Sequence, residues 1–129
     1  MFGKLPAVLP FERESNYNRE IKCYQILKGF QVSQIDGFNV PELIGFDDDL
    51  LAMEITVVSA PYILDFGKAY THEPDYPSDA IEHDLQRCED DFGESWPAVQ
   101  CAIFELRHMG IWYVDAKPSN ISCEGLKIE

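Results

Sequence analysis

The chain has 129 residues, which is enough for one domain of ordinary size and too few for a two-domain enzyme. Hydrophobic residues make up 46% of the sequence and charged residues 26%, a balance that favours a folded core over intrinsic disorder. Ten Lys and Arg residues against 23 Asp and Glu residues give a formal net charge of −13, which repels phosphate backbones and anionic lipid. We therefore expect neither a nucleic-acid partner nor a membrane partner.

Cysteine usage and the lack of targeting signals suggest the compartment. The sequence holds no apolar run of membrane-spanning length and no secretory signal, which predicts a cytoplasmic protein. The four cysteines have no C-x-x-C spacing, so a zinc site is not indicated. Four cysteines could form two disulfides, but a chain of this size does not need disulfides to be stable. We therefore expect four reduced thiols.

The first half of the chain predicts a strand, a helix and a hairpin. The apolar run of residues 5–11, interrupted by two prolines, is strand-like. Residues 13–28 should form a helix that ends at Gly29, which we expect to adopt a left-handed conformation. Two strands, residues 42–46 and 50–58, flank an aspartate turn.

The second half predicts a proline-containing loop followed by two helices. Residues 71–78 lack periodicity, and apolar residues at helical spacing indicate helices over residues 79–92 and 96–109. Gly93 and Gly110 should close them. The end of the chain reads as a loop and a small hairpin around Glu124 and Gly125.

The segment with the clearest chemistry runs from Gly110 to Ile121 and reads GIWYVDAKPSNI. In such a loop Asp115 can take the proton of a substrate hydroxyl, Lys117 can balance charge on a phosphoryl group, and Asn120 can ligate Mg²⁺. A polar turn shaped by its proline is the structural alternative. The position directly after a capped helix favours the chemical interpretation.

This segment resembles the catalytic loop of the protein kinase family, in which G-I-x-H-R-D-L-K-P-x-N-I follows a long helix. The resemblance implies an α+β chain with a minimal protein-kinase-like fold. A small antiparallel sheet would pack with an αC-like helix, and two helices would belong to the C-terminal lobe. Residues 1–58 would be the N-lobe-like part, 59–70 the hinge region and 71–129 a partial C-lobe within a single domain.

The resemblance also implies a site for ATP and Mg²⁺. Met53 would be the gatekeeper, and the backbone groups of Glu54 and Thr56 would face the adenine. Glu20 matches the helix glutamate that the family pairs with a strand lysine, for which Lys4 is the upstream candidate. A solvated terminal Lys4 is an equally open interpretation. Because Glu20 also lies on the apolar stripe of its helix, its carboxylate should need a cation.

Several parts of the family pattern are missing. Tyr113 and Val114 replace the histidine and arginine of the loop, no G-x-G-x-x-G precedes Lys4, and no D-F-G follows Asn120. The tripeptide Asp65-Phe66-Gly67 spells D-F-G but lies between the hinge and the catalytic loop. We interpret it as a turn after the hinge, and its match to D-F-G as a coincidence.

Two functions from different classes follow. The first is a degenerate, pseudokinase-type module that binds a nucleotide weakly or binds a protein partner. The alternative is an atypical ATP/Mg-dependent phosphotransferase of the Ser/Thr protein kinase type, alone or as part of a longer chain. Phosphoryl transfer depends on positioning and charge neutralisation, so the missing parts favour the module. The truncated lobe should also leave apolar residues that need a protein partner or a second copy. These residues are Phe2, Leu5, Val8, Leu9, Phe11, Trp112 and Ile121.

Overall fold

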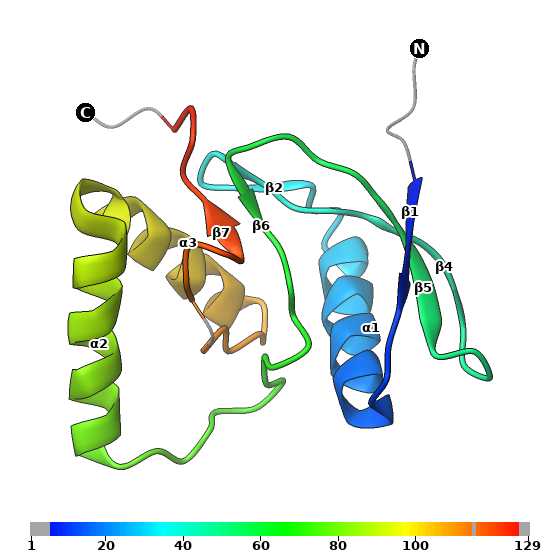
Figure 1. Cartoon of the computed structure of the whole chain (residues 1–129), viewed down its shortest axis with the longest axis horizontal. Helices are drawn as coiled ribbons and strands as arrows, with labels where there is room; N and C mark the ends of the chain where they lie inside the picture. Colours follow the sequence, from blue (N-terminus) through cyan, green and yellow to red (C-terminus); the bar gives the residue numbers. More distant parts are fainter. Residues whose placement is uncertain (1–5, 115, 127–129) are drawn as a thin grey trace.

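The computed structural model describes residues 6–114 and 116–126 and has a mixed α+β architecture. Its elements in chain order are β1 (Pro6–Pro10), α1 (Glu14–Gly29), β2 (Gln34–Ile35), β3 (Phe38–Asn39), β4 (Leu43–Asp47), β5 (Ala52–Thr56), β6 (Tyr62–Ile63), α2 (Ser78–Phe92), the 3₁₀ turn η1 (Gly93–Ser95), α3 (Trp96–His108) and β7 (Ile121–Ser122). The first sheet and α1 lie at one end, α2 and α3 at the other, with β6 and β7 between them (Figure 1). Within the described ranges, no helix is long and apolar enough to cross a membrane.

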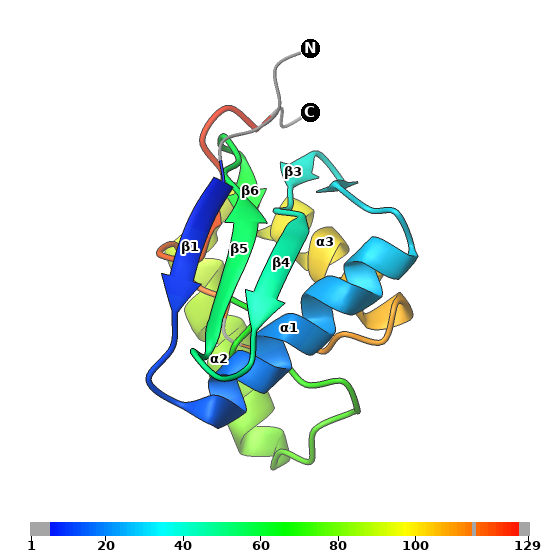
Figure 2. The ribbon, with the colours of Figure 1, turned by 90° about the vertical axis from the view of Figure 1, so that its right-hand side faces the viewer.

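The first sheet has the strand order β1-β5-β4, and both pairs are antiparallel. Figure 2 shows β5 between the other two strands. The expected hairpin is confirmed as β4 and β5, and the expected helix as α1, whose buried residues include Tyr17, Tyr24 and Leu27. These side chains share the core with Met53 and Ile55 of β5. The apolar stripe of α1 therefore covers one face of a sheet whose middle strand is β5.

The left-handed stop of α1 lies two residues later than expected. Gln31, with φ of 56°, adopts the left-handed conformation, and its amide donates to the carbonyl of Lys28 (3.0 Å). The amide of Val32 donates to the carbonyl of Leu27, also at 3.0 Å. These two bonds satisfy carbonyls at the helix end, so the residue after the cap, rather than Gly29, makes the turn.

β1 is an edge strand of the first sheet, and its prolines remove N–H donors from the free edge. The amide of Phe11 donates to the carbonyl of Leu51 (2.9 Å), so by strand alternation the amides of Ala7 and Leu9 also face β5. The outward positions are then Pro6, Val8 and Pro10, of which only Val8 has an N–H group. The free edge is consequently a poor template for another strand.

The second sheet joins segments that are far apart in the sequence. Its order is β2-β3-β6-β7, and β6 pairs antiparallel with β7 through Tyr62 opposite Ser122 and Ile63 opposite Ile121. The chain turns at Glu124 and Gly125, where the amide of Leu126 donates to the carbonyl of Cys123 (3.0 Å). The second arm of the hairpin expected there, residues 127–129, lies outside the described residues. The expectation of an uncovered Ile121 is wrong, because the pairing of β7 with β6 buries it.

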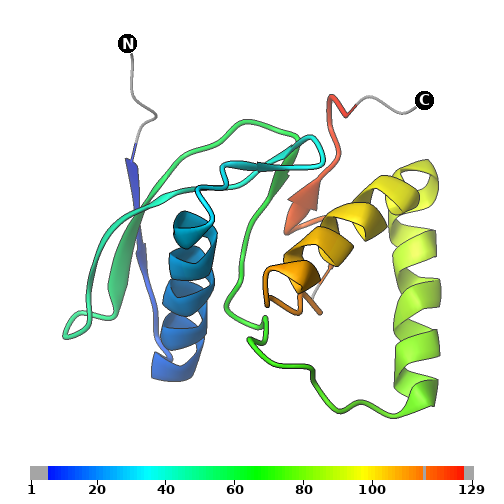
Figure 3. The ribbon, with the colours of Figure 1, turned by 180° about the vertical axis from the view of Figure 1, so that it is seen from behind.

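The two later helices form as predicted and differ in how deeply they are buried. α3 places Val99, Ala102 and Leu106 in the core, whereas α2 buries only Cys88. Gly110, with φ of 93°, turns the chain out of α3 into a segment where Trp112 forms an isolated antiparallel bridge with Tyr70. Seen from behind, α2 and α3 diverge from their junction at η1 (Figure 3).

Of the apolar residues expected to need a cover, Leu9 and Phe11 pack partly against the core. Val8 remains 64% exposed. Phe2 and Leu5 lie outside the described residues.

Candidate functional site

The tripeptide Asp65-Phe66-Gly67 forms a tight turn directly after β6. Asp65 has a φ of 61°, and one of its carboxylate oxygens, Oδ1, accepts a hydrogen bond from the amide of Gly67 (3.2 Å). Just before the turn, the amide of Leu64 donates to the carbonyl of Asn120 (2.8 Å), and the Tyr113 hydroxyl donates to the carbonyl of Leu64. Two bonds therefore hold the start of this turn against the catalytic-loop-like segment.

Phe66 anchors the same turn in the core. Its ring is fully buried and packs edge-on against Tyr24 of α1, with ring centroids 5.2 Å apart, and against Tyr113, with centroids 5.3 Å apart. Such edge-to-face pairs contribute beyond their buried area. One side chain thus links α1, the Asp65 turn and the segment after α3.

Glu20 holds the turn from the side of α1. Only 3% of this residue is exposed, and its carboxylate accepts hydrogen bonds from the amides of Phe66 and Gly67 and from the Tyr24 hydroxyl. Burial raises the pKa of Glu20 to about 7, although these hydrogen bonds oppose the shift. A Cβ atom at Gly67 would lie 3.2 Å from Oε2 of Glu20, so the glycine permits this close approach.

No cation is among the groups that the structure describes as acting on Glu20. The candidate cation, Lys4, lies outside the described residues, so the expectation that Glu20 pairs with it stays a prediction. Neutral hydrogen-bond donors satisfy the carboxylate because the turn brings two amides to it, which the spacing along α1 could not indicate.

A cavity of about 440 Å³ lies beside this turn, between β1, α1 and the chain that follows β5. Its walls are mostly apolar, and Glu20 and Asp65 are its two carboxylates. Apolar lining residues include Ala7, Leu9, Val57, Val58 and Leu64. A cavity of this size with a few convergent polar groups is typical of small-molecule sites.

The three residues expected at the adenine, Met53, Glu54 and Thr56, lie on β5 of the first sheet. Met53 is buried and does not line the cavity, and Glu54 stands between Val8 and Gly45 in the sheet. Thr56 lines the cavity, but its amide already donates to the carbonyl of Glu42 (3.0 Å). The reason is that β5 is a middle strand, whose polar backbone groups are used by both neighbours. Any base in this cavity would meet the backbone after β5 instead.

Lys117 and Asn120, the remaining predicted residues that the structure describes, belong to one turn. The amides of Asn120 and Ile121 both donate to the carbonyl of Lys117, at 2.9 and 3.0 Å. Lys117 is half-buried and Asn120 is buried. Asp115 lies outside the described residues. Through the bond between Leu64 and Asn120, this turn is joined to the Asp65 turn.

The sequence predicts that Asp65-Phe66-Gly67 is a turn after the hinge and that its match to D-F-G is a coincidence. The turn is confirmed. The structure joins this turn to the catalytic-loop-like segment, a proximity that the chain order could not indicate. Within residues 6–114 and 116–126, no three His, Cys, Asp or Glu side chains gather as a ready metal site. A cation here would therefore need further ligands, such as an amide oxygen or the phosphates of a nucleotide.

No protein-family model, no curated protein and no solved structure matches this chain. The kinase resemblance accordingly rests on the sequence motif from Gly110 to Ile121.

Proposed function

We propose that the chain is a degenerate, pseudokinase-type module that binds a magnesium nucleotide weakly in the cavity beside Asp65. One observation carries this proposal. In the resemblance, the strand after the catalytic loop forms a hairpin with a second strand. D-F-G comes directly after that second strand. Here β6 is the antiparallel partner of β7, and Asp65-Phe66-Gly67 follows β6.

The first sheet and α1 support the same interpretation. In the resemblance, a strand, the αC-like helix and a hairpin make up the N-lobe, and the chain supplies β1, α1, β4 and β5 in that order. Glu20 of α1 contacts the D-F-G-like turn directly. The minimal kinase-like fold is thus part of the proposal, and the mixed α+β architecture is its observed basis.

The donor set suits a hard cation. Carboxylate and amide oxygens are preferred ligands of Mg²⁺, which also takes phosphate oxygens from a nucleotide. Asp65 and Asn120 are the residues that would hold the ion, and the apolar walls of the cavity would take the base. Local cations or a metal ion would have to offset the field of a chain of net charge −13, which repels free phosphates.

The alternative, an ATP/Mg-dependent phosphotransferase, gains from the position of Asp65. The missing D-F-G was one reason to prefer a non-catalytic module, and Asp65 offers a substitute. Asp115 would act as the base and Lys117 as the phosphate contact. We retain the module as first choice because β1 supplies no lysine for the phosphates. The four free thiols are consistent with the cytoplasmic location that we include in the proposal.

Calorimetry with ATP, in Mg²⁺ and in chelator, tests this function. We expect a dissociation constant of about 0.1 mM or weaker in Mg²⁺ and a further loss in chelator. Asp65→Asn and Asn120→Ala should remove the metal-dependent part, whereas Asp49→Asn in the exposed β4–β5 turn should not. Wild-type affinity in Asp65→Asn would refute the proposed site. Transfer of labelled phosphate that is lost in Asp115→Asn would establish the phosphotransferase instead.

A further inference from the structure

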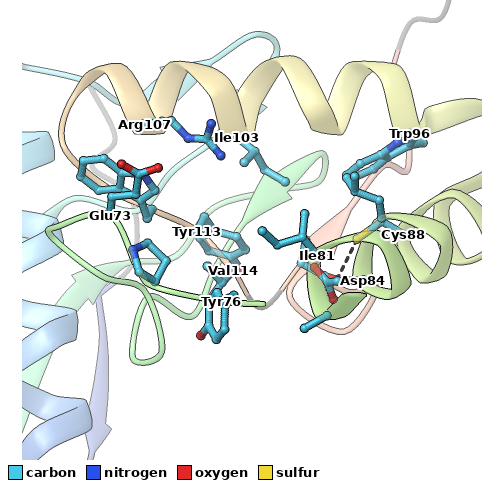
Figure 4. A pocket seen from close by; sticks show the side chains of 15 residues that line it. Glu73, Tyr76, Ile81, Asp84, Cys88, Trp96, Ile103, Arg107, Tyr113 and Val114 are labelled. Carbon is cyan, nitrogen blue, oxygen red and sulfur yellow. Dashed lines mark hydrogen bonds between the residues drawn. The ribbon is translucent and has the colours of Figure 1, made fainter. Parts of the chain in front are cut away.

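A second cavity, also of about 440 Å³, lies between α2, α3, the loop before α2 and the segment after α3. It shares no lining residue with the cavity beside Asp65. Figure 4 shows side chains from all four segments turned toward it. Its large apolar and aromatic lining residues include Tyr76, Ile81, Leu85, Trp96, Ile103 and Trp112. We call this cavity the α2–α3 groove.

The α2 side of the groove is an unpartnered helix face. Ile81, Leu85 and Cys88 recur at helical spacing on α2, yet only Cys88 is buried. Ile81 is 48% exposed and Leu85 is 43% exposed. The two helices meet at η1 and then diverge, so no helix of the described residues covers the first turns of α2 (Figure 1). Apolar surface of this kind, gathered in a groove, is typical of a docking site.

The surroundings of the groove are strongly acidic. Residues 71–108 contain ten Asp and Glu residues and two Arg residues. Both arginines are engaged within the fold. Arg87 forms ion pairs with Asp84 (2.7 Å) and Asp91 (3.1 Å), and the Arg107 guanidinium lies over the Phe104 ring, 5.3 Å from its centroid. The charged residues that line the groove itself are Glu73, Asp84 and Arg107, and the excess of carboxylates comes from the surrounding residues 71–108. Its field therefore attracts cations.

The groove also adjoins the catalytic-loop-like segment. Val114 and Ala116, the two neighbours of Asp115 in the sequence, are among its lining residues. On the opposite wall, the Cys88 thiol of α2 contacts the carbonyl of Ala116 (3.9 Å). A chain seated in the groove would consequently lie against the segment to which the family resemblance assigns chemistry.

We propose that the α2–α3 groove docks a cationic, amphipathic segment of a partner protein. Apolar side chains of that segment fill the space between α2 and α3, and its Lys or Arg side chains meet the acidic rim. Charge selects this occupant over a second copy, because two chains of net charge −13 repel each other. The proposal gives a chemistry to the partner-binding side of the proposed module and does not depend on nucleotide binding.

Fluorescence anisotropy without nucleotide or metal tests the groove. The probe is a labelled synthetic helical peptide with Leu at positions i, i+3, i+4 and i+7 and Arg at the other positions. The matched control peptide has Glu in place of every Arg. We expect the Arg peptide alone to bind, with an affinity that falls as salt rises. The double variant Ile81→Gln and Leu85→Gln should weaken binding by about tenfold or more.

The control is Ile44→Gln, since Ile44 is 47% exposed on the first sheet and lies outside the groove. It should bind the Arg peptide as the wild type does. Glu73→Gln should weaken binding and reduce its salt dependence. Because Ile81 and Leu85 are half-exposed, their variants should remain folded, which urea unfolding verifies.

Three results would overturn the proposal. They are equal binding of the Glu peptide, unchanged binding by the double variant, and a wild-type dimer in sedimentation that the double variant dissociates. The third would identify a second copy as the occupant. Failure of ATP binding alone would leave the groove intact, since the peptide assay contains no ATP.

Discussion

Replacing Glu20 by Gln should change how the stability of this protein depends on pH. The Glu20 pKa rises from 4.5 to about 7 on folding, chiefly because the carboxylate is buried. At a pH between these two pKa values, the folded state therefore keeps a proton that the unfolded state has lost. Stability from this group is fully present below about pH 4.5 and is lost as pH rises through about 7. Since a tenfold change in proton affinity corresponds to about 1.4 kcal/mol, the loss is on the order of 3 kcal/mol.

Urea unfolding of the wild type and of Glu20→Gln, followed by tryptophan fluorescence at about pH 4.5 and pH 8, measures this effect. Gln cannot ionise, so the variant should not lose this stability. Between the lower and the higher pH, the free energy of unfolding of the variant should rise by about 3 kcal/mol relative to that of the wild type. Glu14→Gln, on the exposed first turn of α1, controls for the loss of one carboxylate. Curves for the wild type and Glu20→Gln that run parallel over this range would refute the reasoning.

Three further predictions concern packing, the sheet edge and the thiols. Phe66→Ala should cost about 3–5 kcal/mol of unfolding free energy, because it removes a fully buried ring between α1 and the segment after α3; a loss below about 1 kcal/mol would contradict its anchoring role. Replacing both Pro6 and Pro10 by Val adds two outward N–H donors to β1 and should promote self-association in sedimentation, whereas an unchanged monomer would argue against a blunted edge. A thiol reagent should modify exposed Cys101 quickly and Cys23 only after unfolding, because burial raises the Cys23 pKa to about 12. Fast labelling of Cys23 in the folded protein would show that α1 is not packed as described.

The elements that depend on local pattern could be predicted from the sequence. The stripe of α1 repeats with the period of a helix, and β4 and β5 flank a turn built from aspartates, so each forms from neighbours in the chain. The same holds for α2 and α3, whose ends are marked by glycines. Residues such as Asn120 and Glu20 stand out in the sequence because their type and spacing carry a chemical meaning by themselves.

The partner of β7 and the donors to Glu20 were decided only by tertiary structure. A strand of two residues carries too little periodicity to specify what it pairs with, and closure of the fold selects β6 for β7. That choice bonds Leu64, the residue before Asp65, to Asn120, and the turn that follows brings the amides of Phe66 and Gly67 to Glu20. Backbone amides look the same at every position in a sequence. Which of them meets a buried carboxylate therefore depends on how distant segments pack, and no local pattern encodes it.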